Sequence, residues 1–228
     1  MKGRTPGFFR MKAGSILVCL LILTFCGSKS TGIIILCAGD SITEIGYPRF
    51  LHRILNREGI RNKILNQGQS GHNSREYLQF LKKNKTIWAV SSPDFVLLQL
   101  GTNDVRIDQD QTSADEFYRN IKEIILLFRR FRTRAGKSPL ILLATIPPIP
   151  EGTPYPFDSA SRRRVWEEIN PLIEKISQEE NLPLVDNFSL FLSSPHLLQE
   201  VHPSKKGYEA LAQNWVEALK KEGIRNKI

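Results

Sequence analysis

The chain has 228 residues, of which 41% are hydrophobic, and this length favours a single domain with one buried core. Its formal net charge of +9 owes much to residues 1–30, which contain five basic residues and no acidic residue. The remainder carries 27 basic and 23 acidic residues, an ordinary balance for a solvated surface, so no nucleic-acid partner is expected.

The N-terminal segment has the pattern of an export signal. Basic residues precede an apolar run at residues 15–26, which is too short to span a bilayer comfortably. We therefore expect residues 1–27 to be a signal peptide or a lipoprotein signal, with Met11 as an alternative start. The Leu-Thr-Phe-Cys-Gly sequence around Cys26 resembles a bacterial lipobox, although Phe25 replaces the usual small residue. The protein is thus expected to be exported, either to the periplasm or as a membrane-anchored lipoprotein of a bacterium.

A short polar linker, residues 28–32, precedes a domain at residues 33–222 in which strands and helices alternate. Runs rich in β-branched residues or leucine predict strands at 33–38, 64–66, 95–100, 140–145 and 184–186. Helical spacing of apolar residues predicts amphipathic helices at 117–128, 165–176 and 208–219. The strands are apolar enough to be covered on both faces. The order predicts a three-layer α/β/α fold whose doubly wound parallel sheet has about five strands and binds ligands at their carboxyl ends.

Only one of the three cysteines, Cys37, lies in the predicted domain. No intramolecular disulfide is therefore available there, and one thiol cannot build a zinc site. Because Cys37 lies inside the first apolar run, we interpret it as a small buried hydrophobic residue.

Four short polar blocks lie at the ends of predicted elements. They are Gly39-Asp40-Ser41 after the first strand, Asn66 to Gly71 after the second, Leu100 to Asp104 after the third, and Val201 to Ser204 before the last helix. Each block by itself has a structural alternative. Ser41 alone could be a helix N-cap, Gly71 and Asn103 turn residues, and His202 a loop histidine.

Taken together and in this order, the blocks resemble the four signature blocks of the SGNH, or GDSL-type, hydrolase family over residues 33–219. The resemblance implies the flavodoxin-like SGNH fold and a serine esterase. In such an enzyme, Ser41 would be the nucleophile and His202 the base that takes its proton. The resemblance also implies an oxyanion hole formed by the backbone N–H groups of Ser41 and Gly71 and the side-chain amide of Asn103. Glycine at position 71 would let the backbone approach the substrate closely.

The sequence departs from the family pattern at the acid of the triad. The family carries Asp three residues before the catalytic histidine, and this position is Gln199 here. A glutamine carbonyl could accept the Nδ1 hydrogen bond of His202 but offers no charge to stabilise imidazolium. Glu200, one residue closer to the histidine, is the alternative acid. Without either, the site would operate as a Ser41–His202 dyad.

We therefore expect an exported serine esterase that hydrolyses an O-acyl ester, most naturally an acetyl ester on a carbohydrate. The mechanism uses only side chains and water, so no metal or cofactor is expected. The expected partner is an acylated glycan or lipid, with membrane attachment through an N-terminal lipid if Cys26 is modified. Alternatives are a lipase, lysophospholipase or thioesterase, or a weakly active or inactive glycan-binding lipoprotein with the same fold.

Overall fold

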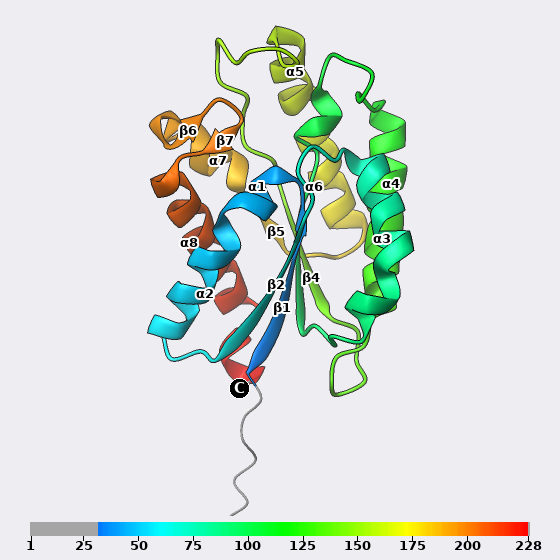
Figure 1. Cartoon of the computed structure of the whole chain (residues 1–228), viewed down its shortest axis with the longest axis vertical. Helices are drawn as coiled ribbons and strands as arrows, with labels where there is room; N and C mark the ends of the chain where they lie inside the picture. The colour runs from blue at the N-terminus through cyan, green and yellow to red at the C-terminus, as the bar shows by residue number, and fades with distance from the viewer. Residues whose placement is uncertain (1–31, 228) are drawn as a thin grey trace, which may run out of the picture. The chain divides into compact units, whose positions relative to one another are not determined.

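The computed structural model describes residues 32–227, so the predicted signal segment and most of the linker lie outside the described residues. The domain is built on a parallel sheet with the strand order β2-β1-β3-β4-β5 (Figure 1). Its strands are β1 (Ile33–Gly39), β2 (Asn62–Gly68), β3 (Phe95–Gln99), β4 (Leu140–Ala144) and β5 (Leu184–Val185). All five correspond to predicted strands, and the predicted α/β fold with a five-stranded parallel sheet is confirmed.

Helices cover both faces of the sheet, and Figure 1 shows α2 and α8 on one side with α3 and α4 on the other. The helices are α1 (Ser41–Ile45), α2 (Tyr47–Arg57), α3 (Ser74–Ala89), α4 (Ala114–Arg129), α5 (Ser159–Arg164), α6 (Asn170–Glu179), α7 (Asn187–Leu192) and α8 (Lys205–Lys221). Shorter turns are η1 (Asn103–Val105), η2 (Val165–Ile169), η3 (Pro195–Leu197) and η4 (Ile224–Lys227), and a separate hairpin pairs β6 (Leu198–Gln199) with β7 (His202–Pro203). Within the described part of the chain, no helix has the length and apolarity needed to cross a membrane.

Successive side chains of each central strand enter different cores because their directions alternate. On β1, Leu36 and Ala38 pack with α3, α4 and α6, whereas Ile35 and Cys37 pack with α1, α2, α7 and α8. Cys37 is fully buried as predicted, and its burial raises the pKa of the thiol to about 12. The two cores therefore explain why these strands are apolar at nearly every position.

The helix predicted at residues 165–176 contains a wider turn. The turn η2 is a π-helix, and the N–H of Asn170 donates to the carbonyl of Val165 instead of that of Trp166. The next residue, Pro171, has no N–H to offer to the preceding turn. A π turn accommodates this missing donor while the apolar stripe, including Ile169 and Ile173, stays buried.

Candidate active site

Three of the four sequence blocks meet at the carboxyl edge of the sheet, because they follow three adjacent strands. Gly39 at the end of β1 is in register with Gly68 of β2 on one side and with Gln99 of β3 on the other. In the sheet, β2 lies on one side of β1 and β3 on the other, so the direction of the strand order reverses at the carboxyl end of β1. Open α/β sheets bind ligands at such a switch point. Ser41, Gly71 and Asn103 come two to four residues after these strand ends.

Ser41 is the first residue of α1, and its hydroxyl lies 2.9 Å from Nε2 of His202 on β7. The cap of this helix is the neighbouring Asp40, whose carboxylate accepts from the N–H of Ile42. Burial raises the pKa of Asp40 to about 6, although the hydrogen bond from Ile42 opposes this. The N-cap role considered for Ser41 thus belongs to Asp40, and the Ser41 hydroxyl is left to pair with the histidine.

The environment of His202 favours its neutral form. Partial burial lowers the pKa of the imidazole below its ordinary value, and the negative charge of Glu200 partly offsets this by raising the pKa. A neutral imidazole with its proton on Nδ1 accepts the Ser41 hydroxyl hydrogen at Nε2. The pair can therefore transfer a proton from serine to histidine.

Backbone and amide donors lie on the segments that follow β2 and β3. Gly71 has a φ of +80°, which favours glycine, and a Cβ there would meet no atom within 4 Å beyond its chain neighbours. Its N–H and that of Ser41 donate to no acceptor within residues 32–227. Nδ2 of Asn103 donates to the carbonyl of His72 at 2.9 Å, which leaves its second amide hydrogen for another acceptor.

Gln199 and Glu200 lie beside His202, but neither forms a hydrogen bond with it in the described part of the chain. Gln199 is directly opposite His202 in the β6–β7 hairpin, so the two side chains share a face. Glu200 occupies the turn between them with a φ of +54° and is exposed. The structure thus brings both residues near the histidine, with Glu200 acting on it through charge alone.

Sequence reasoning missed the buried network that holds the Asn103 segment. The carboxylate of Asp104 is fully buried and accepts from both the N–H and the hydroxyl of Ser74 and from the hydroxyl of Thr112. Burial raises its pKa, and these hydrogen bonds act in the opposite direction. Arg164 donates to the backbone carbonyls of Asp104 and Thr112 at 2.7 Å each. The only sequence signal was that Asp104 directly follows Asn103; nothing marked Arg164 as its support.

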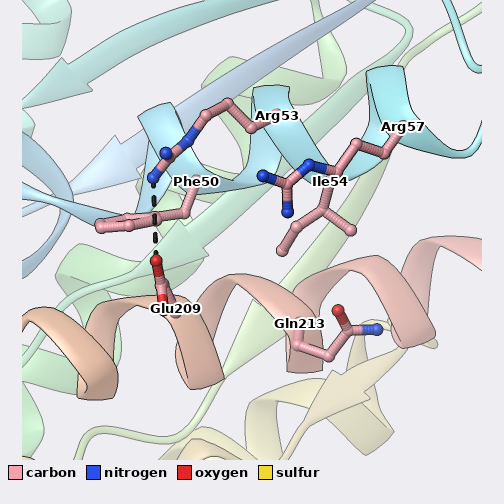
Figure 2. A pocket seen from close by; sticks show the side chains of 6 residues that line it. All are labelled: Phe50, Arg53, Ile54, Arg57, Glu209 and Gln213. Carbon is pink, nitrogen blue, oxygen red and sulfur yellow. Dashed lines mark ion pairs between the residues drawn. The ribbon is translucent and has the colours of Figure 1, made fainter.

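A different hollow, shown in Figure 2, lies between α2 and α8 and holds none of the site residues. Phe50, Arg53, Ile54, Arg57, Glu209 and Gln213 line it. Arg53 lies over the Phe50 ring and pairs with Glu209 at 3.8 Å. Within residues 32–227, no three His, Cys, Asp or Glu side chains are grouped so that they could hold a metal ion.

Comparison with known proteins gives consistent matches. A model of the GDSL-like lipase/acylhydrolase family matches residues 37–210. A multidomain esterase of Ruminococcus flavefaciens is 28% identical over 131 residues, which are 56% of this chain but only 16% of that protein.

Solved structures share the fold over most of the domain. A lipase/acylhydrolase from Enterococcus faecalis has a TM-score of 0.68 and 24% identity, covering 83% of this chain and 96% of its own. An acetyl xylan esterase from Geobacillus stearothermophilus has a TM-score of 0.67 and 23% identity, covering 82% and 94%. A carbohydrate acetylesterase family member from Sinorhizobium meliloti has a TM-score of 0.63 and 18% identity, covering 83% and 98%.

Proposed function

Because the chain belongs to the GDSL-like lipase/acylhydrolase family, we propose that it is a serine esterase with Ser41 as its nucleophile. The observation that carries this proposal is the 2.9 Å contact between the Ser41 hydroxyl and Nε2 of His202, at the sheet edge where Gly71 and Asn103 also lie. A partly buried hydroxyl with a neutral imidazole as its partner is an activated nucleophile.

The reaction follows from these positions. His202 takes the proton of Ser41 as the serine oxygen attacks the ester carbonyl, and the resulting imidazolium gives this proton to the leaving alcohol. The free N–H groups of Ser41 and Gly71 and the second amide hydrogen of Asn103 stabilise the negative charge on the carbonyl oxygen. Water then hydrolyses the acyl-enzyme by the same steps.

We further propose that the ester is an acetyl group on a carbohydrate. Two of the structural relatives named above are an acetyl xylan esterase and a carbohydrate acetylesterase family member. An exposed aromatic ring also supports a sugar ligand. Trp166 is 50% exposed and packs edge-on against Phe188 with ring centroids 4.5 Å apart. Its helical neighbours Arg164 and Ile169 both contact the segment 101–104, which contains Asn103.

One observation favours a second function. Gln199 stands where the family's acid is expected and supplies no charge to His202, which would suit a surface protein that binds a glycan and turns it over slowly or not at all. The retained Ser41–His202 pair argues for the enzyme, because binding alone does not require that contact.

We also propose that the protein is exported and that a lipid on Cys26 anchors it to a membrane. The support is the sequence pattern of basic residues, an apolar run and a cysteine at residues 1–27. Simple secretion into the periplasm is the alternative outcome.

The decisive experiment measures turnover of p-nitrophenyl esters from acetyl to palmitoyl by the purified protein and by Ser41→Ala. We expect turnover that is greatest on acetyl and a variant that is folded by circular dichroism but slower by several orders of magnitude. A preference for long chains would indicate a lipase. If folded wild-type protein turned over none of the esters, the result would favour the alternative function, a glycan-binding protein.

A further inference from the structure

Glu44 makes an unusual connection between the helix of the proposed nucleophile and the loop of a proposed oxyanion donor. It lies on α1, three residues after Ser41. Its Oε2 accepts from the backbone N–H of Ser70 at 2.8 Å and also from the Ser70 hydroxyl. One exposed carboxylate oxygen thus holds two donors of the residue that directly precedes Gly71.

The backbone of α1 at Glu44 also lies close to the end of β2. Nδ2 of Asn66 donates to the carbonyl of Glu44 at 2.9 Å, and Oδ1 of Asn66 accepts from the N–H of Gly68. A Cβ on Gly68 would lie only 2.2 Å from the backbone nitrogen of Glu44, so only glycine fits there. Just beyond Gly68, the N–H of Gln69 still donates to the carbonyl of Gly39 at 2.9 Å, and the Glu44 side chain reaches the loop at the next residue, Ser70.

The loop is attached to the third donor on its other side. The carbonyl of His72 accepts from Nδ2 of Asn103, and the N–H of His72 donates to Gln69. Gly71 lies between Ser70, which Glu44 holds, and His72, which Asn103 holds. It has a positive φ, and a Cβ there would meet no atom within 4 Å. The hydrogen bonds that hold the adjacent residues, Ser70 and His72, therefore set the direction of the Gly71 N–H.

We propose that Glu44 is a positioning residue that holds Ser70, and through it the Gly71 N–H, in register with Ser41 to form the oxyanion hole. This inference rests on the proposed esterase function. A continuous set of contacts joins the three donors: α1 carries Ser41 and Glu44, Glu44 binds Ser70, and His72 binds Asn103.

This role requires a side chain long enough to reach Ser70 and an oxygen that accepts its hydrogen bonds, but it does not require a charge. A carboxylate close to the oxyanion would by itself oppose the negative charge that develops there. The hydrogen bonds from Ser70 lower the pKa of Glu44, so the side chain is ionised when it accepts them. A glutamine could retain one acceptor at the same reach, whereas an aspartate would retain the charge but is one methylene shorter.

The test compares kcat and KM for p-nitrophenyl acetate in wild type, Glu44→Gln, Glu44→Asp and Glu44→Ala. We expect kcat to fall about tenfold to a hundredfold in the Asp and Ala variants with KM changed less than about threefold, because misplacing a donor weakens only transition-state binding. Glu44→Gln should retain kcat within about fivefold, since one hydrogen bond to Ser70 remains. Ser70→Ala, which keeps the N–H donor, should resemble Glu44→Gln.

The matched control is Glu209→Ala, which removes an exposed glutamate paired with Arg53 between α2 and α8 (Figure 2). It should leave kcat and KM unchanged. Higher kcat in Glu44→Asp than in Glu44→Gln would overturn the proposal, because charge would then matter more than reach. Wild-type kcat in Glu44→Ala would overturn it while leaving the esterase intact. Inactive wild-type protein would instead contradict both the proposed function and this inference. If Glu44→Ala fails to fold, the comparison of Glu44→Asp with Glu44→Gln still tests whether reach or charge matters.

Discussion

Placing a carboxylate opposite His202 should accelerate the enzyme and change its pH profile, and Gln199→Asp does this with one substitution. The β6–β7 register sets position 199 directly across from His202, where facing Cβ atoms in a hairpin lie roughly 5 Å apart. Glu200 is the acidic residue whose charge now raises the His202 pKa, and it does so without a hydrogen bond in the described part of the chain. An aspartate at 199 would add a second, closer charge.

The size of the effect follows from Coulomb's law. Unit charges about 5 Å apart attract by about 3 kcal/mol at an effective dielectric constant near 20 and by about 1 kcal/mol in water. Because Gln199 is exposed and His202 is only partly buried, the lower part of this range applies. A gain of about 1.4 kcal/mol would raise the His202 pKa by about one unit and increase kcat about tenfold.

The assay is the pH dependence of kcat/KM for p-nitrophenyl acetate. His202 must be neutral to act as a base, so a raised pKa moves the acidic limb of the profile to higher pH, whereas kcat on the plateau increases. Glu200→Gln is the companion variant, and removing its charge should move the acidic limb to lower pH. An unchanged limb and a rate within about twofold in Gln199→Asp, together with a damaging Glu200→Gln, would refute the reasoning and identify Glu200 as the acid.

Four further predictions concern other parts of the molecule. Asn103→Ala should lower kcat by roughly a hundredfold to a thousandfold with little change in KM, as measured by steady-state kinetics; a change confined to KM would make Asn103 a ground-state binding residue. Trp166→Ala should raise KM for an acetylated xylo-oligosaccharide by about fivefold, and more than for p-nitrophenyl acetate, because a stacked ring is worth about 1 kcal/mol; equal effects on both substrates would argue against a sugar contact. Trp215→Ala, which removes a fully buried ring stacked on Tyr47, should cost about 3–5 kcal/mol in urea unfolding, and a loss below about 1 kcal/mol would contradict this packing. Cys26→Ser should release the protein from the detergent phase into the aqueous phase on phase partitioning, whereas wild-type protein already in the aqueous phase would reject lipidation.

The sequence determined the fold, and it predicted where the candidate site residues lie, because both depend on local patterns. Short continuous apolar runs rich in β-branched residues, such as residues 33–38, favour strands covered on both faces, and helical spacing such as that at residues 208–219 predicts a packed helix. Ser41, Gly71 and Asn103 could be placed at one edge because the carboxyl ends of parallel strands meet there. Four blocks in one order carried the resemblance that the family match confirmed.

Tertiary structure alone decided which residues support those blocks. Arg164 binds the Asp104 carbonyl across 60 positions of sequence, and Glu44 binds Ser70 across 26, and neither spacing has a local signature. The wider turn at Val165–Ile169 likewise accommodates the backbone N–H that Pro171 lacks. Hydrogen bonds between distant segments depend on how helices and loops are oriented by the core. A one-dimensional pattern records which side chains need burial, but it does not record which partners they meet at the edge of the sheet.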